Sequence, residues 1–163
     1  MKQVNLVVRM VMGGLLMLPL MGWSQATLCP NLDLSTGTLQ HWQCYVGENG
    51  GGNYFVQKSP AVPGRHTIMN LEVLLATNQL YDEACNTIEK VPKGFSYSVR
   101  IGNAISGSEV DAIEYEMVVD SMSSLLILSF AWVMEDPSHN PSEQPQFTMK
   151  ITDSNGRVLD IPC

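Results

Sequence analysis

The chain has 163 residues, with 9 Lys and Arg residues against 16 Asp and Glu residues, for a formal net charge of −7. This length suits one domain, and the acidic balance argues against binding to nucleic acid and against electrostatic docking on anionic lipid. At 45% hydrophobic and 15% charged residues, the composition is that of a folded chain rather than a disordered one.

Residues 1–26 have the organisation of a secretory signal peptide. Lys2 and Arg9 form a basic start, residues 10–22 are uncharged and mostly apolar, and Ser24 and Ala26 are small residues where a signal peptidase reads them. The apolar stretch is too short to cross about 30 Å of hydrocarbon, so we expect cleavage before residue 27 and no membrane span afterwards. Residues 27–163 are then expected to form a single β-sandwich domain of a secreted or cell-surface protein.

Short strand and turn signals fill the first part of the mature chain. In chain order we expect a strand or turn over residues 32–42, a Gly-rich loop over 48–53, and strands over 54–56 and 66–69. Leu71, Leu74 and Leu75 share one face at helical spacing, which predicts a short helix within residues 71–80. A long excursion between strands is the alternative for that segment.

Alternation of apolar and polar residues dominates the second part. It predicts half-buried strands over residues 95–101, 113–119 and 147–152, and a short last strand over 158–161. Residues 125–134 are nearly continuously apolar, as expected for a central strand covered on both faces. Residues 136–146 contain three prolines and are expected to form a surface loop. Many short strands with turn signals predict an all-β fold, namely an antiparallel β-sandwich or jelly roll.

The turn before the last strand can be predicted in detail. A two-residue hairpin at Asn155-Gly156 would set Leu159 opposite Thr152, on the polar face. A three-residue loop ending at Gly156 instead sets Leu159 opposite Ile151, on the core face. We therefore expect the longer loop, with Gly156 in a left-handed conformation.

Cys29, Cys44, Cys85 and Cys163 are the cysteines of the chain. An even number in an exported chain predicts two disulfides, with three possible pairings. Their wide and irregular spacing is unlike that of a zinc site.

Residues for catalysis or metal binding are not organised into motifs. No nucleophile elbow, phosphate-binding loop or zinc-protease motif is present. Glu114 and Glu116 share a face of one predicted strand and have the spacing of an acid and base pair, but a solvated strand face explains them better. Oxygen donors near loops lack the spacing of a calcium loop; they are Asp33, Glu48, Asp153 and Asp160. We therefore expect no enzyme, no catalytic residue, no bound metal and no cofactor, with a structural calcium ion as the open alternative.

Aromatic residues gather around the Gly-rich loop. Trp42, Tyr45, Tyr54 and Phe55 flank it, and a flat ring offered to solvent can stack on a sugar. Trp42 and Phe55 are also candidates for the core, because large aromatic residues are buried on average. His139, in the Pro-rich loop, carries a ring with donor and acceptor nitrogens. The candidate ligand-binding residues are thus Trp42, Tyr45, Tyr54 and His139.

Several short segments occur together in one order: CPNLDL (29–34), GTL (37–39), WQCY (42–45), VPGRHTIM (62–69), YSVRIGN (97–103), EDPSHNP (135–141) and QPQF (144–147). The set resembles the N-terminal module of large secreted surface proteins of gliding-type bacteria, which carry PKD-type repeats and a C-terminal sorting domain. The resemblance implies a galactose-binding-like or MAM-like jelly roll, an extracellular location and an adhesive role, and it implies no catalytic residues.

The chain departs from that module in two ways. Asp33, Leu34 and Ser35 stand where the family often has Asp-Phe-Glu, so a calcium ligand offered by that Glu in related modules is lost. The family module also runs on past the position of Cys163, so we expect a jelly roll that is incomplete at its C-terminal end.

These observations predict a non-catalytic, exported surface module for adhesion or glycan binding, with an extracellular glycan or a surface protein as its partner. The alternatives are an accessory domain or remnant of a secreted glycoside hydrolase, and a structural spacer without a ligand.

Overall fold

The computed structural model describes residues 3–11, 29–50, 53–105, 107–120, 125–135, 140 and 144–159, with residues 3–11, 53 and 54 described through their backbone alone. Its elements are β1 (Gln3–Val11), β2 (Trp42–Gly50), β3 (Asn53–Ser59), β4 (His66–Asn70), α1 (Leu71–Ala76), β5 (Tyr97–Ile101), β6 (Glu109–Val118) and β7 (Gln146–Thr152). The predicted all-β fold class is therefore confirmed.

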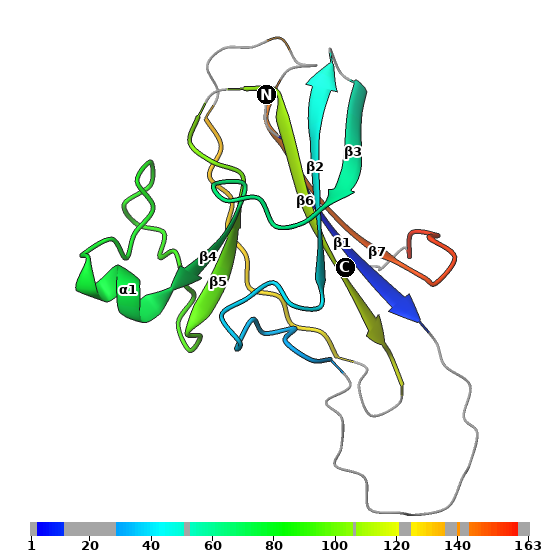
Figure 1. Cartoon of the computed structure of the whole chain (residues 1–163), viewed down its shortest axis with the longest axis horizontal. Helices are drawn as coiled ribbons and strands as arrows, with labels where there is room; N and C mark the ends of the chain where they lie inside the picture. The colour runs from blue at the N-terminus through cyan, green and yellow to red at the C-terminus, as the bar shows by residue number, and fades with distance from the viewer. Residues whose placement is uncertain are drawn as a thin grey trace, which may run out of the picture.

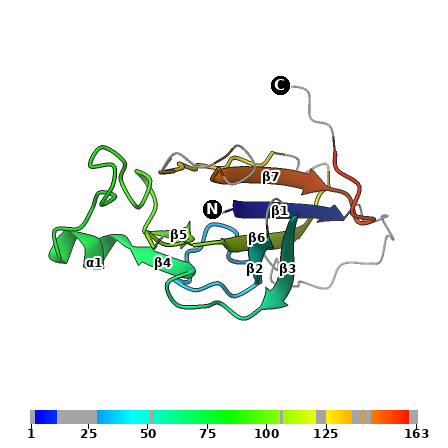
Figure 2. The same cartoon turned by 90° about the horizontal axis from the view of Figure 1, so that it is seen from above.

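The strands of the described residues form a five-stranded sheet in the order β3-β2-β6-β1-β7 and a two-stranded sheet of β4 and β5 (Figure 1). Antiparallel pairing joins β3 to β2, β2 to β6, and β4 to β5. β1 instead runs parallel to both of its neighbours, β6 and β7. The pair β4 and β5 lies beside the larger sheet, with α1 at its far end (Figure 2).

β6 is the central strand of the core. Its residues from Val110 to Tyr115 are buried on both faces of the sheet, although alternation in the sequence predicted only half burial. Tyr115 and Met117 form one apolar cluster with Trp42, whose ring centroid lies 4.9 Å from that of Tyr115. The sheet is thus anchored where β2 crosses onto β6.

The helix α1 confirms the expectation for residues 71–80 and is shorter than that range. Asn70 caps it, because its side-chain oxygen accepts from the backbone N–H groups of Glu72 and Val73. Leu74 is buried against Met69, which fixes the helix on β4. The helix ends at Ala76, after which the Thr77 hydroxyl donates to the carbonyl oxygen of Val73.

The turn after β7 also confirms its prediction. The Leu159 N–H donates to the carbonyl oxygen of Ile151 over 2.8 Å, and the Asp153 N–H donates to that of Arg157 over 2.9 Å. Gly156 has a φ of +79°, the left-handed conformation that the longer loop requires. The strand expected over residues 158–161 is reduced to a single bridge between Thr152 and Val158, and residues 160–163 lie outside the described residues.

Two other expectations differ from the structure. Residues 125–134 are not a strand, and the position between β6 and β7 is held by β1. The Gly-rich loop expected from residue 48 is shorter, because β2 extends through Gly50. β1 lies within the predicted signal peptide, whose cleavage stays a prediction. Across the described ranges, no helix is long and apolar enough to span a bilayer.

Candidate functional site

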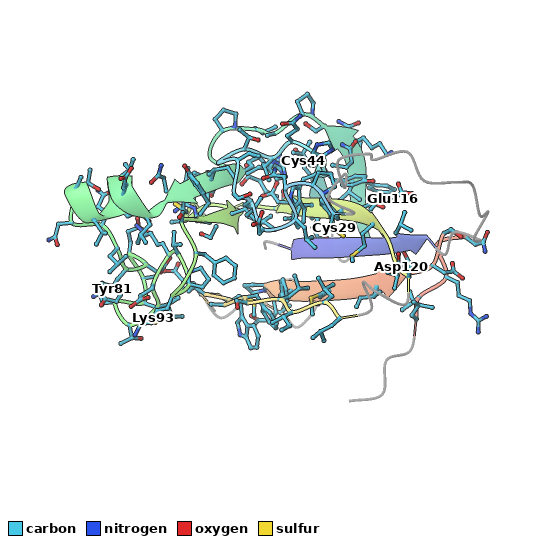
Figure 3. The ribbon with its side chains drawn as sticks, turned by 90° about the horizontal axis from the view of Figure 1, so that it is seen from below. Cys29, Cys44, Tyr81, Lys93, Glu116 and Asp120 are labelled. Carbon is cyan, nitrogen blue, oxygen red and sulfur yellow. The ribbon has the colours of Figure 1, made fainter. Side chains whose placement is uncertain are left out.

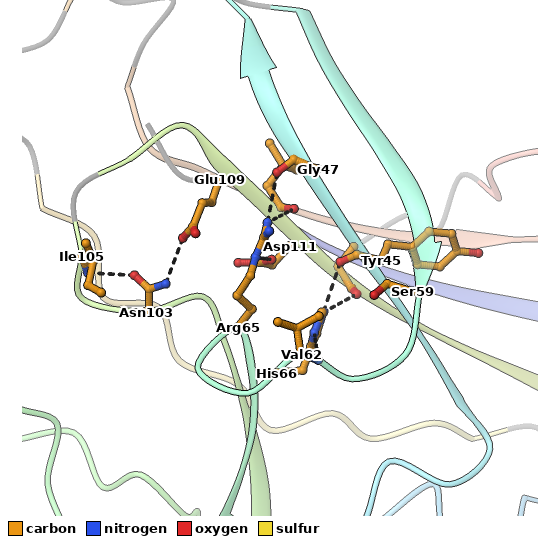
Figure 4. A network of polar contacts seen from close by, with 12 residues as sticks. Tyr45, Gly47, Ser59, Val62, Arg65, His66, Asn103, Ile105, Glu109 and Asp111 are labelled. Atoms are coloured by element: carbon orange, nitrogen blue, oxygen red, sulfur yellow. Dashed lines mark hydrogen bonds and ion pairs between the residues drawn. The ribbon is translucent and has the colours of Figure 1, made fainter.

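Arg65, immediately before β4, reaches into the large sheet (Figure 4). Its Nε donates to the Asp111 carboxylate over 2.5 Å, and its Nη2 donates to the carbonyl oxygens of Gly47 and Val110 over 3.0 Å each. Burial raises the pKa of Asp111, and the positive charge of Arg65 offsets part of that rise. The forked guanidinium thus joins β2 and β6 to the start of β4.

His66 lies beside this pair and has both ring nitrogens engaged. Nδ1 accepts from the Val62 N–H over 3.2 Å. Nε2 lies 3.1 Å from the carbonyl oxygen of Tyr45 and 3.2 Å from that of Ala112. Because both carbonyls can only accept, the geometry assigns the ring proton to Nε2. Neither nitrogen is left to bind a metal or to transfer a proton to a substrate.

Glu114 corrects the expectation of a solvated pair of carboxylates. It is buried, and its carboxylate accepts a hydrogen bond from the Tyr45 hydroxyl of β2. Glu116 is exposed toward the end of β6 (Figure 3). The two carboxylates therefore differ in environment, because Tyr45 reaches Glu114 diagonally from its position opposite Ala112.

The polar side chains described above form hydrogen bonds between different strands and loops. Arg65, Asp111, His66 and Glu114 each bond to another element of the fold. Within the part of the chain that the structure describes, no cluster of three or more His, Cys, Asp and Glu side chains is placed to hold a metal ion. The bonds of these four side chains therefore serve to hold the strands together.

The described candidate calcium ligands do not form a shared calcium site. Asp33 and Asp153 accept from backbone N–H groups within their own turns, from Ser35 in the first case and from Asn155 and Arg157 in the second. Bonding to Ser35 lowers the pKa of Asp33. Glu48 lies exposed on β2, and Asp160 lies outside the described residues.

The hairpin of β2 and β3 offers the best candidate surface for binding. Phe55 of the edge strand β3 is 78% exposed, and it stands directly opposite Glu48 of β2. Gln57, two residues along β3, shares its face of the strand. Glu48 and Gln57 are also exposed. We call these three residues, Phe55, Glu48 and Gln57, the Phe55 face.

Gly47 sets the position of this face. A Cβ atom built on Gly47 would lie 1.7 Å from the carbonyl oxygen of Phe55. Only glycine therefore allows the backbone of β3 to approach β2 this closely. The Gly47 carbonyl is held in turn by Arg65, which links the Phe55 face to the buried ion pair.

Of the predicted ligand-binding residues, only Trp42 and Tyr45 have side chains that the structure describes, and these two lie on opposite faces of β2. Trp42 is half-buried, donating its indole N–H to the carbonyl oxygen of Asn31, so it belongs to the core. Tyr45 lies three residues after Trp42 in β2, so its side chain points to the opposite face of the sheet, where it bonds to Glu114. Tyr54 is on β3, described through its backbone alone, and His139 lies outside the described residues. Phe55, expected in the core, is instead strongly exposed.

A groove of about 1080 Å³ lies elsewhere, between β5 and the segment 125–135. Its lining is mainly apolar and includes Leu34, Ile101, Leu126, Leu128 and Phe130. The floor includes Ile113 of the central strand. The groove thus opens directly onto the core face of the large sheet.

The cysteines do not form the expected pattern. Cys29, Cys44 and Cys85 are free thiols, and Cys163 lies outside the described residues. Two disulfides would need at least one bridge among the first three, so the expectation of two is not met in this structure. Cys44 is enclosed in the sheet, where burial raises its pKa, whereas bonding to Thr87 lowers the pKa of the Cys85 thiol.

Comparisons with known proteins give no relative from which a role can be transferred: no family model, no curated protein and no solved structure matches the chain. The candidate site therefore rests on its own geometry.

Sequence reasoning missed the residues that build the site. Arg65 and Asp111 are 46 positions apart, and nothing local indicates that they pair. The exposure of Phe55 had only a weak signal in the sequence. Polar residues, Gln57 to Ser59, follow Val56, and a Gly-rich segment precedes Phe55.

Proposed function

We propose that this chain is a non-catalytic, exported surface module that binds a glycan through the Phe55 face. One observation carries the proposal: Phe55, which is 78% exposed, lies opposite the exposed Glu48 and shares a strand face with the exposed Gln57. An aromatic ring presented to solvent offers a flat apolar surface on which a ligand can pack.

The chemistry of the Phe55 face suits a sugar. The flat, electron-rich face of the Phe55 ring can pack against the C–H groups of a pyranose. Glu48 accepts hydrogen bonds, and Gln57 both donates and accepts, which matches the mixed donors and acceptors of sugar hydroxyls. The three side chains sit on a paired ribbon rather than a loop, so little ordering is needed on binding.

The sheet centre supports a binding role over an enzymatic one. Glu114 is bonded to Tyr45, and Asp111 is paired with Arg65, so neither carboxylate is available as a general acid or base. The predicted signal peptide and the resemblance to modules of bacterial surface proteins support an extracellular, adhesive setting. A jelly-roll relationship is part of the same proposal.

A glycan array probed with the full chain and two variants tests the proposal. Phe55→Ala removes the ring and is expected to weaken binding to the recognised glycans at least tenfold. Val73→Ala, on α1, is the matched control, since Val73 is an apolar side chain that is 57% exposed away from β3, and it should bind as the unchanged chain does.

Three results would contradict the proposal. Unchanged binding by Phe55→Ala would place the ligand elsewhere. Binding to no glycan at all would favour the spacer interpretation, and cleavage of an arrayed glycan would favour the hydrolase remnant.

A further inference from the structure

Residues 125–134 present apolar side chains to solvent although they lie next to a sheet. Leu125 is 80% exposed, Ile127 is 78% exposed and Trp132 is 57% exposed. Leu126 packs against the Tyr115 cluster, so the segment touches the core without forming a strand. Such a run of exposed apolar residues is costly for a protein in water.

The sheet contains a position that fits this segment. β6 and β7 are both parallel to β1, so they run in the same direction with one strand between them. Consecutive strands of an up-and-down meander have this relation when the chain between them forms the antiparallel middle strand. The chain between β6 and β7 contains residues 125–134.

The register of the neighbours also fits. Tyr115 and Ile151 are aligned through Val8, and Ile113 and Met149 are aligned through Leu6. An antiparallel strand that places Leu128 between Tyr115 and Ile151 places Phe130 between Ile113 and Met149.

The segment already lies near that arrangement. The ring centroid of Phe130 is 5.7 Å from that of Phe147 on β7, and the ring centroid of Trp132 is 6.2 Å from it. Leu126 already contacts the apolar cluster of Tyr115 and Met117. Once β1 has left its position, the segment needs only a local shift to enter the sheet.

We propose that residues 3–11 and residues 125–134 compete for the single position between β6 and β7. β1 occupies this position in the uncleaved chain. When β1 leaves it, the segment 125–134 enters and pairs antiparallel to both β6 and β7. The replacement exchanges two parallel pairings for antiparallel pairings with sequence neighbours, which pair slightly more strongly and close shorter loops. It also moves one apolar wall of the groove into the sheet.

This inference goes beyond the proposed function, since it concerns the sheet and not the Phe55 face. If residues 1–26 are cleaved on export, cleavage is the event that withdraws β1. The exported form would then differ from the uncleaved chain in the strand between β6 and β7, which would link completion of the fold to export.

Hydrogen exchange on the full chain tests the competition. Val7→Pro in β1 removes a ladder N–H in the middle of the sheet, where proline is not tolerated. In this variant the amides of residues 125–134 should exchange at least tenfold more slowly than in the unchanged chain. β2 and β6 should stay protected, because the incoming strand replaces β1.

A second substitution separates entry into the sheet from general collapse. Ala131→Pro, added to Val7→Pro, should abolish the new protection, whereas Ala131→Ser keeps the N–H and should preserve it. Fast exchange of residues 125–134 in Val7→Pro with β2 and β6 still protected would overturn the proposal. Loss of protection throughout the sheet would overturn it equally, since no strand would then have replaced β1.

Discussion

The guanidinium of Arg65 lies 2.5 Å from the carboxylate of Asp111, whose side chain is only 2% exposed. The pair joins the approach to β4 with the central strand β6, and the same guanidinium holds the carbonyl of Gly47 beneath the Phe55 face. A buried carboxylate needs such a partner, because leaving its charge uncompensated away from water is costly.

Arg65→Met is therefore expected to destabilise the fold by about 3–5 kcal/mol, the usual cost of leaving one charge of a buried pair without its partner. Denaturant unfolding measures this difference in the free energy of unfolding, provided that its dependence on denaturant concentration is the same in both proteins. Arg157→Met is the control, because Arg157 is exposed in the turn after β7, and it should change stability by less than about 0.5 kcal/mol. Equal effects of the two changes would contradict the structural role of the pair.

His66→Asn should also lower stability, by about 1–3 kcal/mol, since the shorter side chain leaves buried carbonyls of β2 and β6 without their donor. His41→Asn is the matched control. His41 is exposed and has a φ of +71°, a conformation that asparagine tolerates. Thermal melts of both variants should separate them, and a His66→Asn chain that melts with the unchanged protein would disprove the bridging role.

Asn31 organises the segment that precedes β2. Its side chain donates to the carbonyl oxygens of Thr38 and Gln40 and accepts from the N–H and hydroxyl of Thr36. Asn31→Ala is expected to cost about 2–4 kcal/mol, because the buried Asn31 side chain loses four hydrogen bonds at once.

Asn78→Ala separates these bonds from backbone strain. Asn78 has a φ of 55°, close to the 57° of Asn31, but its side chain is exposed. Its replacement should cost only the strain of a left-handed alanine, about 1 kcal/mol. If chemical unfolding gave the two variants the same stability, the network around Asn31 would contribute nothing.

Tyr115 predicts a loss of stability at high pH. Burial raises the pKa of Tyr115 to about 12, and its hydroxyl donates to the carbonyl oxygen of Pro30 over 2.7 Å. The unfolded state releases this proton near its ordinary pKa of 10.0, while the folded state keeps it. Stability should therefore fall as the pH rises from about 10 to about 12, and Tyr115→Phe should remove that part of the slope. Unfolding midpoints across this range provide the measurement, and an identical slope in Tyr115→Phe would refute the assignment.

The parts of the fold that follow local rules were predictable from sequence. The turn ending at Gly156 could be predicted, because a shift of one residue would have put Leu159 on the polar face of the hairpin. The short helix could also be predicted, because Leu71 and Leu74 are apolar residues at helical spacing. β2 was not predicted, since Gly47 and Gly50 suggest a loop rather than a strand.

Other features depend on long-range choices that local patterns do not contain. Residues 125–134 have the composition of a central strand, but composition does not tell which of two segments occupies a position in a sheet. The Arg65–Asp111 pair depends on how β4 meets β6. The exposure of Phe55 depends on β3 being an edge strand, a property of strand order rather than of residue type.

Chemical-shift mapping by NMR locates the bound glycan on the surface of the chain. The full chain, labelled with 15N, is titrated with a glycan selected on the array, and the backbone signals are followed. We expect the largest shifts on Phe55, Glu48 and Gln57, with the signals of α1 unchanged. Shifts centred instead on the groove, at Leu34 and Ile101, with Phe55 unmoved, would contradict this expectation.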